Sequence, residues 1–370
     1  MYFDHSATTP VHPDVQNLIN SINHEIYGNP SSIYHLGQKA RSIIENARNQ
    51  IAKSINTTSK KIIFTSGGTE ANNHVLWSML KRKKNHVISN VIEHPAIIKV
   101  LQFLTDLNVN HSLIQVNNQG IIDIDDLINK INNNTGLISI MMANNEIGTI
   151  QPLDNVIKLA HDKGILVHTD AVQCLGKIDI DVEKLGVDFL SLSAHKFYGP
   201  KGVGILYVKN PEKMHPLIIG GNQENSLRGG TENVASIAGM GLAAEIAINC
   251  IENTIKHLKT LEKQFKDALN NNFKNIMYNG NQIKKIPGLV SASFPNNDSK
   301  IMLIRLDREK IYVSNGSACG AGDVKPSPVL SAIGLDDASN LSTLRFSFGR
   351  TNNVEEIKFL IDRLNKIVSY

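Results

Sequence analysis

The chain of 370 residues can bury a large core, so one or two domains are the natural expectation. Its 41% hydrophobic and 19% charged residues form an ordinary globular composition, and a net charge of +4 is too small to predict nucleic-acid binding. No apolar run approaches the roughly 20 residues that span a bilayer, and the amino terminus lacks the basic and apolar regions of a signal peptide. The 3 cysteines are odd in number and far apart, which argues against a disulfide framework and favours a reducing cytoplasmic location.

The amino-terminal part of the chain alternates polar turns with predicted elements. Residues 4–10 (Asp-His-Ser-Ala-Thr-Thr-Pro) form a polar turn cluster, and apolar spacing over residues 38–56 predicts a helix. A short predicted strand, Ile62–Thr65, runs into residues 66–73 (Ser-Gly-Gly-Thr-Glu-Ala-Asn-Asn), where helical spacing resumes. A strand, a glycine turn and a helix start expose backbone N–H groups to an anion. Because the stretch lacks the P-loop lysine and the dinucleotide fingerprint, a phosphate monoester fits better than a nucleotide. A capped helix start that needs only a tight turn is the alternative.

Two further predicted strands end in polar residues. Residues 86–89 lead to Glu93-His94-Pro95-Ala96, where a histidine could stack on a flat ring, move a proton or serve only as a structural hydrogen bonder. Residues 137–142 form a continuous apolar run, as expected for a strand buried on both faces of a parallel sheet. That run stops at a polar cluster, residues 144–149, which contains Asn145.

The predicted strand over residues 164–168 closes on Thr169-Asp170-Ala171-Val172-Gln173. An ionised carboxylate at the end of a buried strand needs a cationic partner. A protonated pyridine nitrogen would be such a partner for Asp170, and Gln173 could then bond a phenolic oxygen on the same ring. The plainer interpretation makes Asp170 the N-cap of a helix.

The stretch with the most chemistry is Ser193-Ala194-His195-Lys196, which follows a buried strand over residues 187–190. A lysine at the lip of a buried strand is costly unless it is exposed, paired or covalently used. We interpret Lys196 as a Schiff-base lysine that holds an aldehyde cofactor, with Ser193 and His195 donating to its phosphate. In open α/β sheets ligands bind at the carboxyl ends of the strands, where Thr69, His94, Asn145, Asp170 and Lys196 are all expected.

The pattern changes in the last third of the chain. A polar glycine-rich loop, residues 220–233, precedes a long predicted helix over residues 235–251, and amphipathic helical spacing continues to about residue 269. Residues 289–294, 300–306 and 344–348 alternate more and suggest a smaller α+β domain. Cys319 lies among glycines and small residues in the sequence, a setting in which a thiol is expected to be accessible. Arg345 is a candidate to bind a carboxylate through two hydrogen bonds of its guanidinium group.

Taken together, these motifs resemble the cysteine desulfurases of the NifS- or IscS-like group, in the class V aminotransferase family. The resemblance runs in register from Tyr2 to about Asn352 and rests on seven stretches: residues 4–10, 66–73, 93–95, 144–148, 170–173, 193–196 and 316–319. It implies a fold-type-I α/β transferase whose large domain contains a mostly parallel seven-stranded sheet. We expect this domain over residues 14–254 and a smaller α+β domain over residues 1–13 and 255–370.

The resemblance also implies a role for each matching residue. Lys196 would bind pyridoxal 5'-phosphate (PLP), His94 would stack on its ring and act in catalysis, and Cys319 would take the sulfur of L-cysteine. The cofactor contacts would come from Gly68, Thr69, His94, Asn145, Asp170, Gln173, Ser193, His195 and Lys196, with Thr231 reaching in from the partner subunit of a homodimer. Asn145 and Arg345 would bind the substrate carboxylate.

The expected activity gives L-alanine and a persulfide on Cys319, which passes its sulfur to an acceptor such as an iron–sulfur scaffold or a tRNA-thiolation enzyme. A class V aminotransferase or a selenocysteine lyase on the same fold is the alternative, and a transaminase would not need Cys319. Neither a metal, direct nucleic-acid contact nor membrane attachment is expected. His5-Ser6 replaces the commoner Asn-Ala of the family, and Gly320 to Gly322 follow the cysteine where Thr-Ser is frequent.

Overall fold

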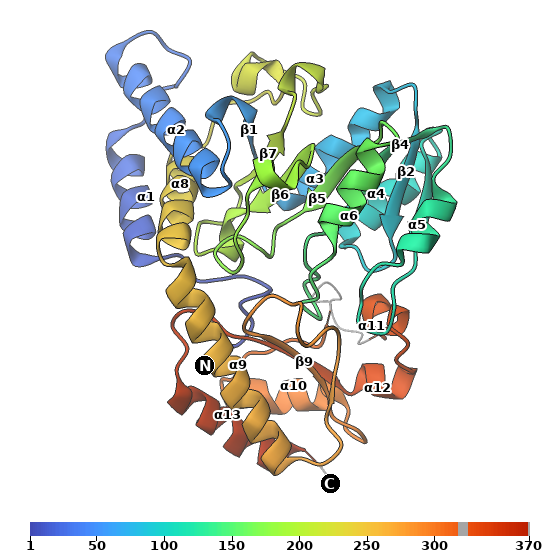
Figure 1. The fold of residues 1–370 in the computed structure, drawn as a ribbon. Coiled ribbons are helices and arrows are strands. Elements are labelled where there is room, and N and C mark those ends of the chain that lie inside the picture. The colour runs from blue at the N-terminus through green and yellow to red at the C-terminus, as the bar shows by residue number, and fades with distance from the viewer. Residues whose placement is uncertain (317–324, 369–370) are drawn as a thin grey trace.

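The computed structural model describes residues 1–316 and 325–368, and its main feature is a seven-stranded sheet (Figure 1). The strand order is β1-β7-β6-β5-β4-β2-β3, with bounds β1 Ile62–Thr65, β2 His86–Asn90, β3 Asn110–Ile114, β4 Thr135–Ser139, β5 Leu166–Asp170, β6 Phe189–Ser193 and β7 Gly204–Val208. Only β7 runs against its neighbours, because it pairs antiparallel with both β1 and β6 while the other pairs are parallel. The expected α/β class with a mostly parallel seven-stranded sheet is confirmed.

Consecutive strand residues point to opposite faces of this sheet, and both faces are buried. Val87 and Leu137 pack with helices α3 (Gly68–Trp77) and α4 (Pro95–Thr105), whereas the adjacent Ile88 and Ile138 pack into the core on the other face. That second core also includes residues of α2 (His35–Ser54), α6 (Leu153–His161) and α8 (Val234–Asn249). Burial on two faces explains why the strands are continuous apolar runs. The remaining helices of this part are α1 Pro13–Glu25, α5 Ile124–Lys130 and α7 Val182–Leu185.

A second, smaller sheet has the antiparallel order β10-β9-β8 and a core of its own. Its strands are β8 Met277–Tyr278, β9 Leu289–Ser293 and β10 Thr343–Ser347, and its helices are α9 Ile251–Asn272, α10 Ser299–Arg308, α11 Pro328–Ala332, α12 Asp337–Leu341 and α13 Val354–Ile367. The amino terminus joins this part, since Phe3 is fully buried in its core and Asp4 forms a bridge with Ser347. The domain boundaries given above stay a prediction.

Two local features differ from what the sequence suggests. The long helix is bent by 72° at Cys250, where α8 ends and α9 begins. Residues 300–306, which alternate in the sequence, lie in helix α10. The bend follows from packing, because α8 belongs to the core of the large sheet and α9 to the core of the small one.

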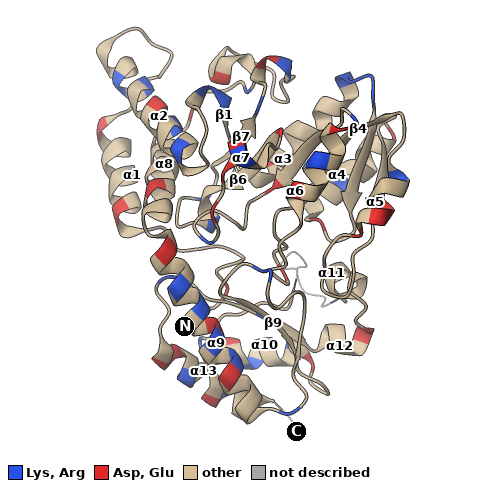
Figure 2. Cartoon of the chain, in the orientation of Figure 1, with Lys and Arg blue, Asp and Glu red and all other residues tan. Residues whose placement is uncertain are grey.

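Charged residues of both signs are spread over the outer helices of the described part (Figure 2). Among the described residues no single helix is long and apolar enough to cross a membrane, although the bent pair α8 and α9 meets the length and composition criteria when taken together.

Candidate active site

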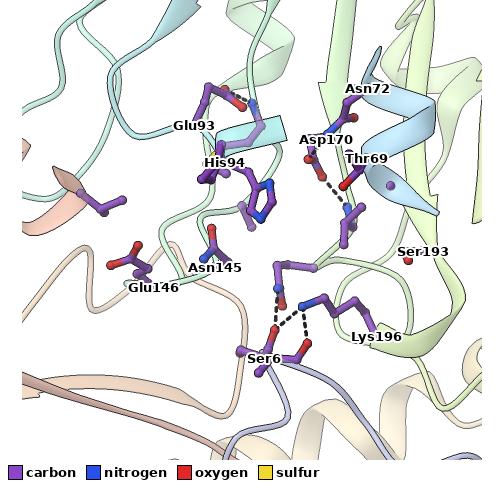
Figure 3. A pocket seen from close by; sticks show the side chains of 18 of the residues that line it. Ser6, Thr69, Asn72, Glu93, His94, Asn145, Glu146, Asp170, Ser193 and Lys196 are labelled. Atoms are coloured by element: carbon purple, nitrogen blue, oxygen red, sulfur yellow. Dashed lines mark hydrogen bonds between the residues drawn. The ribbon is translucent and has the colours of Figure 1, made fainter. Parts of the chain in front are cut away.

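The carboxyl ends of the parallel strands open into a cavity of about 300 Å³ (Figure 3). Its lining includes most of the residues singled out from the sequence: Gly68, Thr69, His94, Asn145, Asp170, Gln173, Ser193, His195, Lys196 and Arg345. Residues from the small-sheet part close the cavity, because Arg345 belongs to β10 and Val329 to α11. Side chains that lie more than 300 positions apart in the sequence therefore face one space.

Lys196 follows β6 on a single 3-10 turn, Ala194–Lys196, and its amine reaches across to the amino-terminal segment. The Nζ atom donates to the carbonyl oxygens of Ser6 at 2.6 Å and Ala7 at 2.7 Å. Burial lowers the pKa of this amine to about 7, and the positive charges of Arg345 and Lys177 act in the same direction. A substantial fraction of Lys196 is therefore an uncharged, nucleophilic amine near neutral pH.

Asp170 ends β5 with its carboxylate at the cavity wall, and 8% of the residue is exposed. Its oxygens accept hydrogen bonds from Asn72 Nδ2 at 2.6 Å and from the backbone N–H of Val172 at 3.0 Å. Residues 171–174 form a turn and not a helix, so the N-cap interpretation is wrong. Within the described residues Asp170 forms no ion pair, which leaves a nearly buried carboxylate facing the cavity.

The turn between β1 and α3 presents the start of a ten-residue helix to the cavity. Gly67 has φ of +155°, and a Cβ on Gly68 would come within 2.7 Å of Val172 Cγ2, so only glycine fits there without a shift. Ser193 lies beside both glycines. Backbone N–H groups, the positive end of the helix dipole and the hydroxyls of Thr69 and Ser193 are therefore placed where they could bind one anion.

Two histidines face the cavity as neutral rings. His94 caps α4, with Nδ1 accepting from the N–H of Ala96 at 3.1 Å, so the ring proton lies on Nε2. Burial lowers the pKa of His94, and nearby Lys196 acts in the same direction while Asp170 opposes them. His195 Nδ1 lies 3.1 Å from Thr8 Oγ1, and burial lowers its pKa to about 4.

Arg345 lies at the floor of the cavity, with only 2% of the residue exposed. Its guanidinium donates to Asp4 Oδ1 at 2.7 Å and to the backbone carbonyl of Asn145 at 3.0 Å. Its Nε has no hydrogen-bond partner among the described residues. The planar guanidinium group of Arg345, which already binds the Asp4 carboxylate, has the geometry to bind a second carboxylate.

Gln173 lines the cavity and is held by the amino-terminal segment, because its Nε2 donates to the carbonyl oxygen of Ser6 at 2.9 Å. Two other predicted residues are not among the lining residues of the described part. Thr231 is exposed, outside the lining of this cavity, and Cys319 falls outside the described residues.

Four polar or charged residues of the lining are not predicted as site residues from the sequence: Ser6, Asn72, Glu93 and Glu146. Asn72 holds Asp170, and Ser6 supplies a carbonyl to Lys196. Glu93 accepts from Met141 N at 2.6 Å, and burial raises its pKa well above the usual value. Asn72 and Ser6 fall inside the motifs quoted above, but only contacts across the fold reveal what they do.

Comparison with known proteins places this architecture in a family. The family model Aminotransferase class-V matches residues 1–360. Cysteine desulfurase IscS of Dictyoglomus turgidum is 43% identical over 371 residues, covering 100% of this chain and 94% of that protein, and the IscS of Clostridium botulinum is 39% identical with the same coverage.

Solved structures agree with the sequence relatives. A NifS-like protein superposes with a TM-score of 0.93 at 35% identity, covering 99% of this chain and 98% of that one. SspA in complex with cysteine gives a TM-score of 0.82 at 33% identity, covering 94% and 98%. With these matches over nearly its whole length, the chain belongs to the class V aminotransferase family and, within it, to the NifS- and IscS-like cysteine desulfurases.

Proposed function

We propose that the protein is a PLP-dependent cysteine desulfurase that converts L-cysteine to L-alanine and leaves a persulfide on Cys319. The observation that carries the proposal is the placement of the Lys196 amine, the Asp170 carboxylate and the α3 amino terminus around one cavity. The substrate is supported by the relatives, which are named cysteine desulfurases, and by the similar SspA, whose structure contains cysteine.

Members of the class V aminotransferase family are PLP enzymes, and the cavity fits that cofactor. Ser6 Oγ, Asn72 Oδ1 and Glu93 Oε2 are buried polar atoms of the lining without a hydrogen-bond partner among the described residues. We infer that Lys196 binds the aldehyde and Asp170 the ring nitrogen, that His94 covers the ring and that Gln173 bonds its phenolic oxygen. The phosphate contacts would come from Gly68, Thr69, Ser193 and His195.

When bound, PLP supplies an electron-accepting ring that acidifies the Cα–H of the attached amino acid. The residues of the chain do the rest. Arg345 and Asn145 bind the substrate carboxylate and so orient the Cα–H bond. Lys196, uncharged in part near pH 7, accepts the Cα proton at Nζ. Asp170 keeps the ring nitrogen protonated, and neutral His94 can transfer a proton through Nε2.

The sulfur step uses Cys319. Its thiolate attacks the substrate sulfur, an S–S bond forms while the C–S bond breaks, and the electron pair of that bond returns to the substrate carbon, which becomes the methyl group of alanine. Atoms balance, since L-cysteine and one thiol give L-alanine and one persulfide. We infer that an acceptor protein, an iron–sulfur scaffold or a tRNA-thiolation enzyme, then takes the sulfur. A reducing cytoplasmic location would keep the thiol available.

We further infer a homodimer. Thr231 is exposed at the end of the glycine-rich loop and does not line the cavity of its own chain. In a dimer it can complete the phosphate site of the partner subunit, so separated subunits should hold the cofactor weakly.

Substitution of Cys319 separates a desulfurase from a transaminase. Cys319→Ser should keep the yellow colour of the bound cofactor and still bind L-cysteine, but should lose alanine formation by at least about a hundredfold, since serine cannot accept sulfur. Cys250→Ser, which alters an exposed thiol, is the matched control and should retain most activity. Alanine formation by Cys319→Ser at the parent rate would contradict the proposal and favour the aminotransferase or selenocysteine lyase alternative.

A further inference from the structure

Lys196 also lines a second and much smaller cavity of about 10 Å³, which is too small for anything larger than a water molecule. Lys177 and His5 line it together with Lys196. The turn that follows β5 brings Lys177 to this place, because Gly176 adopts φ of +76°. The proposed function gives Lys196 a role but gives Lys177 none.

A relay of hydrogen bonds joins the two lysines. Lys177 Nζ donates to Gln173 Oε1 at 3.4 Å, and Gln173 Nε2 donates to the carbonyl of Ser6 at 2.9 Å. That same carbonyl accepts from Lys196 Nζ at 2.6 Å, as the dashed line in Figure 3 marks. An ammonium group can only donate, so Lys177 requires the oxygen of the Gln173 amide to face it. The NH2 end of the amide must then face Ser6 and the main cavity.

Lys177 also carries a positive charge, and the titratable groups that act on it are the Cys174 thiol, which favours that charge, and Arg345, which opposes it. Among the described residues no carboxylate forms an ion pair with it, and its acceptor is a neutral amide oxygen. An unpaired ammonium group acts on its neighbours at longer range than a paired one does. Burial lowers the pKa of Lys177 to about 8, so the group is still charged over most of the neutral range. Its charge lowers the pKa values of both Lys196 and His5.

We propose that Lys177 is a positioning residue for the reaction, which fixes the amide of Gln173 and keeps Lys196 uncharged by placing a second positive charge near it. The inference rests on the proposed function for its chemical purpose, because an uncharged Lys196 is needed to bind the cofactor aldehyde and to accept the Cα proton. The charged and titratable groups that act on Lys196 are Asp4, His94, Asp170, Lys177, His195 and Arg345. Of these, Lys177 is the cation that contacts neither the substrate nor the cofactor in the proposed reaction.

The test measures the reactivity of Lys196 directly, in the full-length protein freed of cofactor and without L-cysteine. Trace reductive methylation with formaldehyde and a borane modifies the uncharged form of an amine, and peptide mapping gives its rate at each lysine from pH 6 to pH 10, roughly the range over which perturbed lysines titrate. The exposed lysines Lys60 and Lys99 serve as internal references. In the parent protein Lys196 should be labelled at a lower pH than these references.

Lys177→Met should slow the labelling of Lys196 at neutral pH by about three- to tenfold relative to the references, because the opposing charge is lost. Lys177→Arg keeps the charge and should restore the parent rate, which a merely structural role would not predict. If Lys177→Met fails to fold, Lys177→Gln removes the same charge and replaces it in the measurement. Labelling of Lys196 that does not change when the charge is removed, or that falls equally in Lys177→Arg, would overturn the inference.

Failure of the proposed function has a separate signature. Because the labelling uses neither cofactor nor L-cysteine, its outcome does not depend on whether the protein forms alanine. An unchanged Lys196 rate together with normal alanine formation counts against Lys177 alone. A changed rate without alanine formation in the parent protein counts against the desulfurase activity alone.

Discussion

A buried ion pair beneath the glycine-rich loop gives a prediction whose magnitude follows from the structure. Arg48 of α2 donates to the two carboxylate oxygens of Glu224 at 2.6 and 2.7 Å and to the carbonyl of Ile62 at 3.0 Å. The side chains of the pair are 9% and 2% exposed. Glu224 begins three consecutive residues with positive φ, of 47°, 55° and 64°. The left-handed conformation costs about 1–2 kcal/mol for most residues, and the ion pair holds Glu224 at the start of this segment.

Arg48→Met leaves Glu224 buried with one remaining donor, the N–H of Phe64 at 2.8 Å. Removal of one partner of a buried pair costs about 3–5 kcal/mol. Unfolding entropy of about 2.1 cal/mol/K per residue gives about 0.8 kcal/mol/K for a chain of this length. The midpoint of thermal unfolding should therefore fall by about 4–6 °C.

Differential scanning calorimetry of the single and double variants measures this effect. Arg48→Met/Glu224→Gln should recover about half of the loss, because the uncompensated charge is gone. Arg308→Met, which alters an exposed arginine of α10, is the control and should change the midpoint by less than about 1 °C. A double variant that is no more stable than Arg48→Met would refute the assignment of the loss to a buried unpaired carboxylate.

Three other substitutions test the site and its surroundings. Burial lowers the pKa of His5 to about 4, so the folded state resists protonation of this ring. Between pH 6.5 and 4 the free energy of unfolding of the parent should therefore fall by about 2–3 kcal/mol more than that of His5→Asn, as urea titrations at each pH can measure. The folded pKa of Lys196, about 7, lies below its unfolded value of 10.5, so this amine makes the stability of the cofactor-free protein rise with pH between these values. Lys177 and Lys285, whose pKa values burial lowers to about 8, add to the same rise, so Lys196→Met should reduce the rise in the same titrations without abolishing it. Asp170→Asn should still bind cofactor but slow Cα deprotonation by about a hundredfold or more, since a neutral ring nitrogen withdraws fewer electrons; stopped-flow absorbance that matches the parent rate would remove Asp170 from the mechanism.

The sequence predicts the elements that position the site, because parallel strands buried on both faces leave strong apolar runs. Each of these runs ends near a residue of the cavity, as β5 does at Asp170 and β6 before Lys196. Because the carboxyl ends of parallel strands meet at one edge of a sheet, these side chains are predicted to lie close together.

Contacts across large sequence separations could not be predicted in this way. Lys196 bonds the carbonyl of Ser6, and Arg345 pairs with Asp4, over separations of 190 and 341 residues. Nothing in local spacing or composition distinguishes these partners from other polar residues. The bend at Cys250 was missed for a related reason, since helical periodicity continues through it while the two helices pack against different cores.

The central claim is that sulfur moves from L-cysteine to Cys319, and one measurement tests it most directly. The purified protein is mixed with one equivalent of L-cysteine without a reductant, alanine is quantified, and the cysteine-containing peptides are weighed by mass spectrometry. The account predicts that alanine forms in step with one added sulfur atom on the Cys319 peptide, and that the peptides of Cys174 and Cys250 gain none. Alanine formed without sulfur on Cys319, or sulfur on Cys319 without alanine, would contradict it.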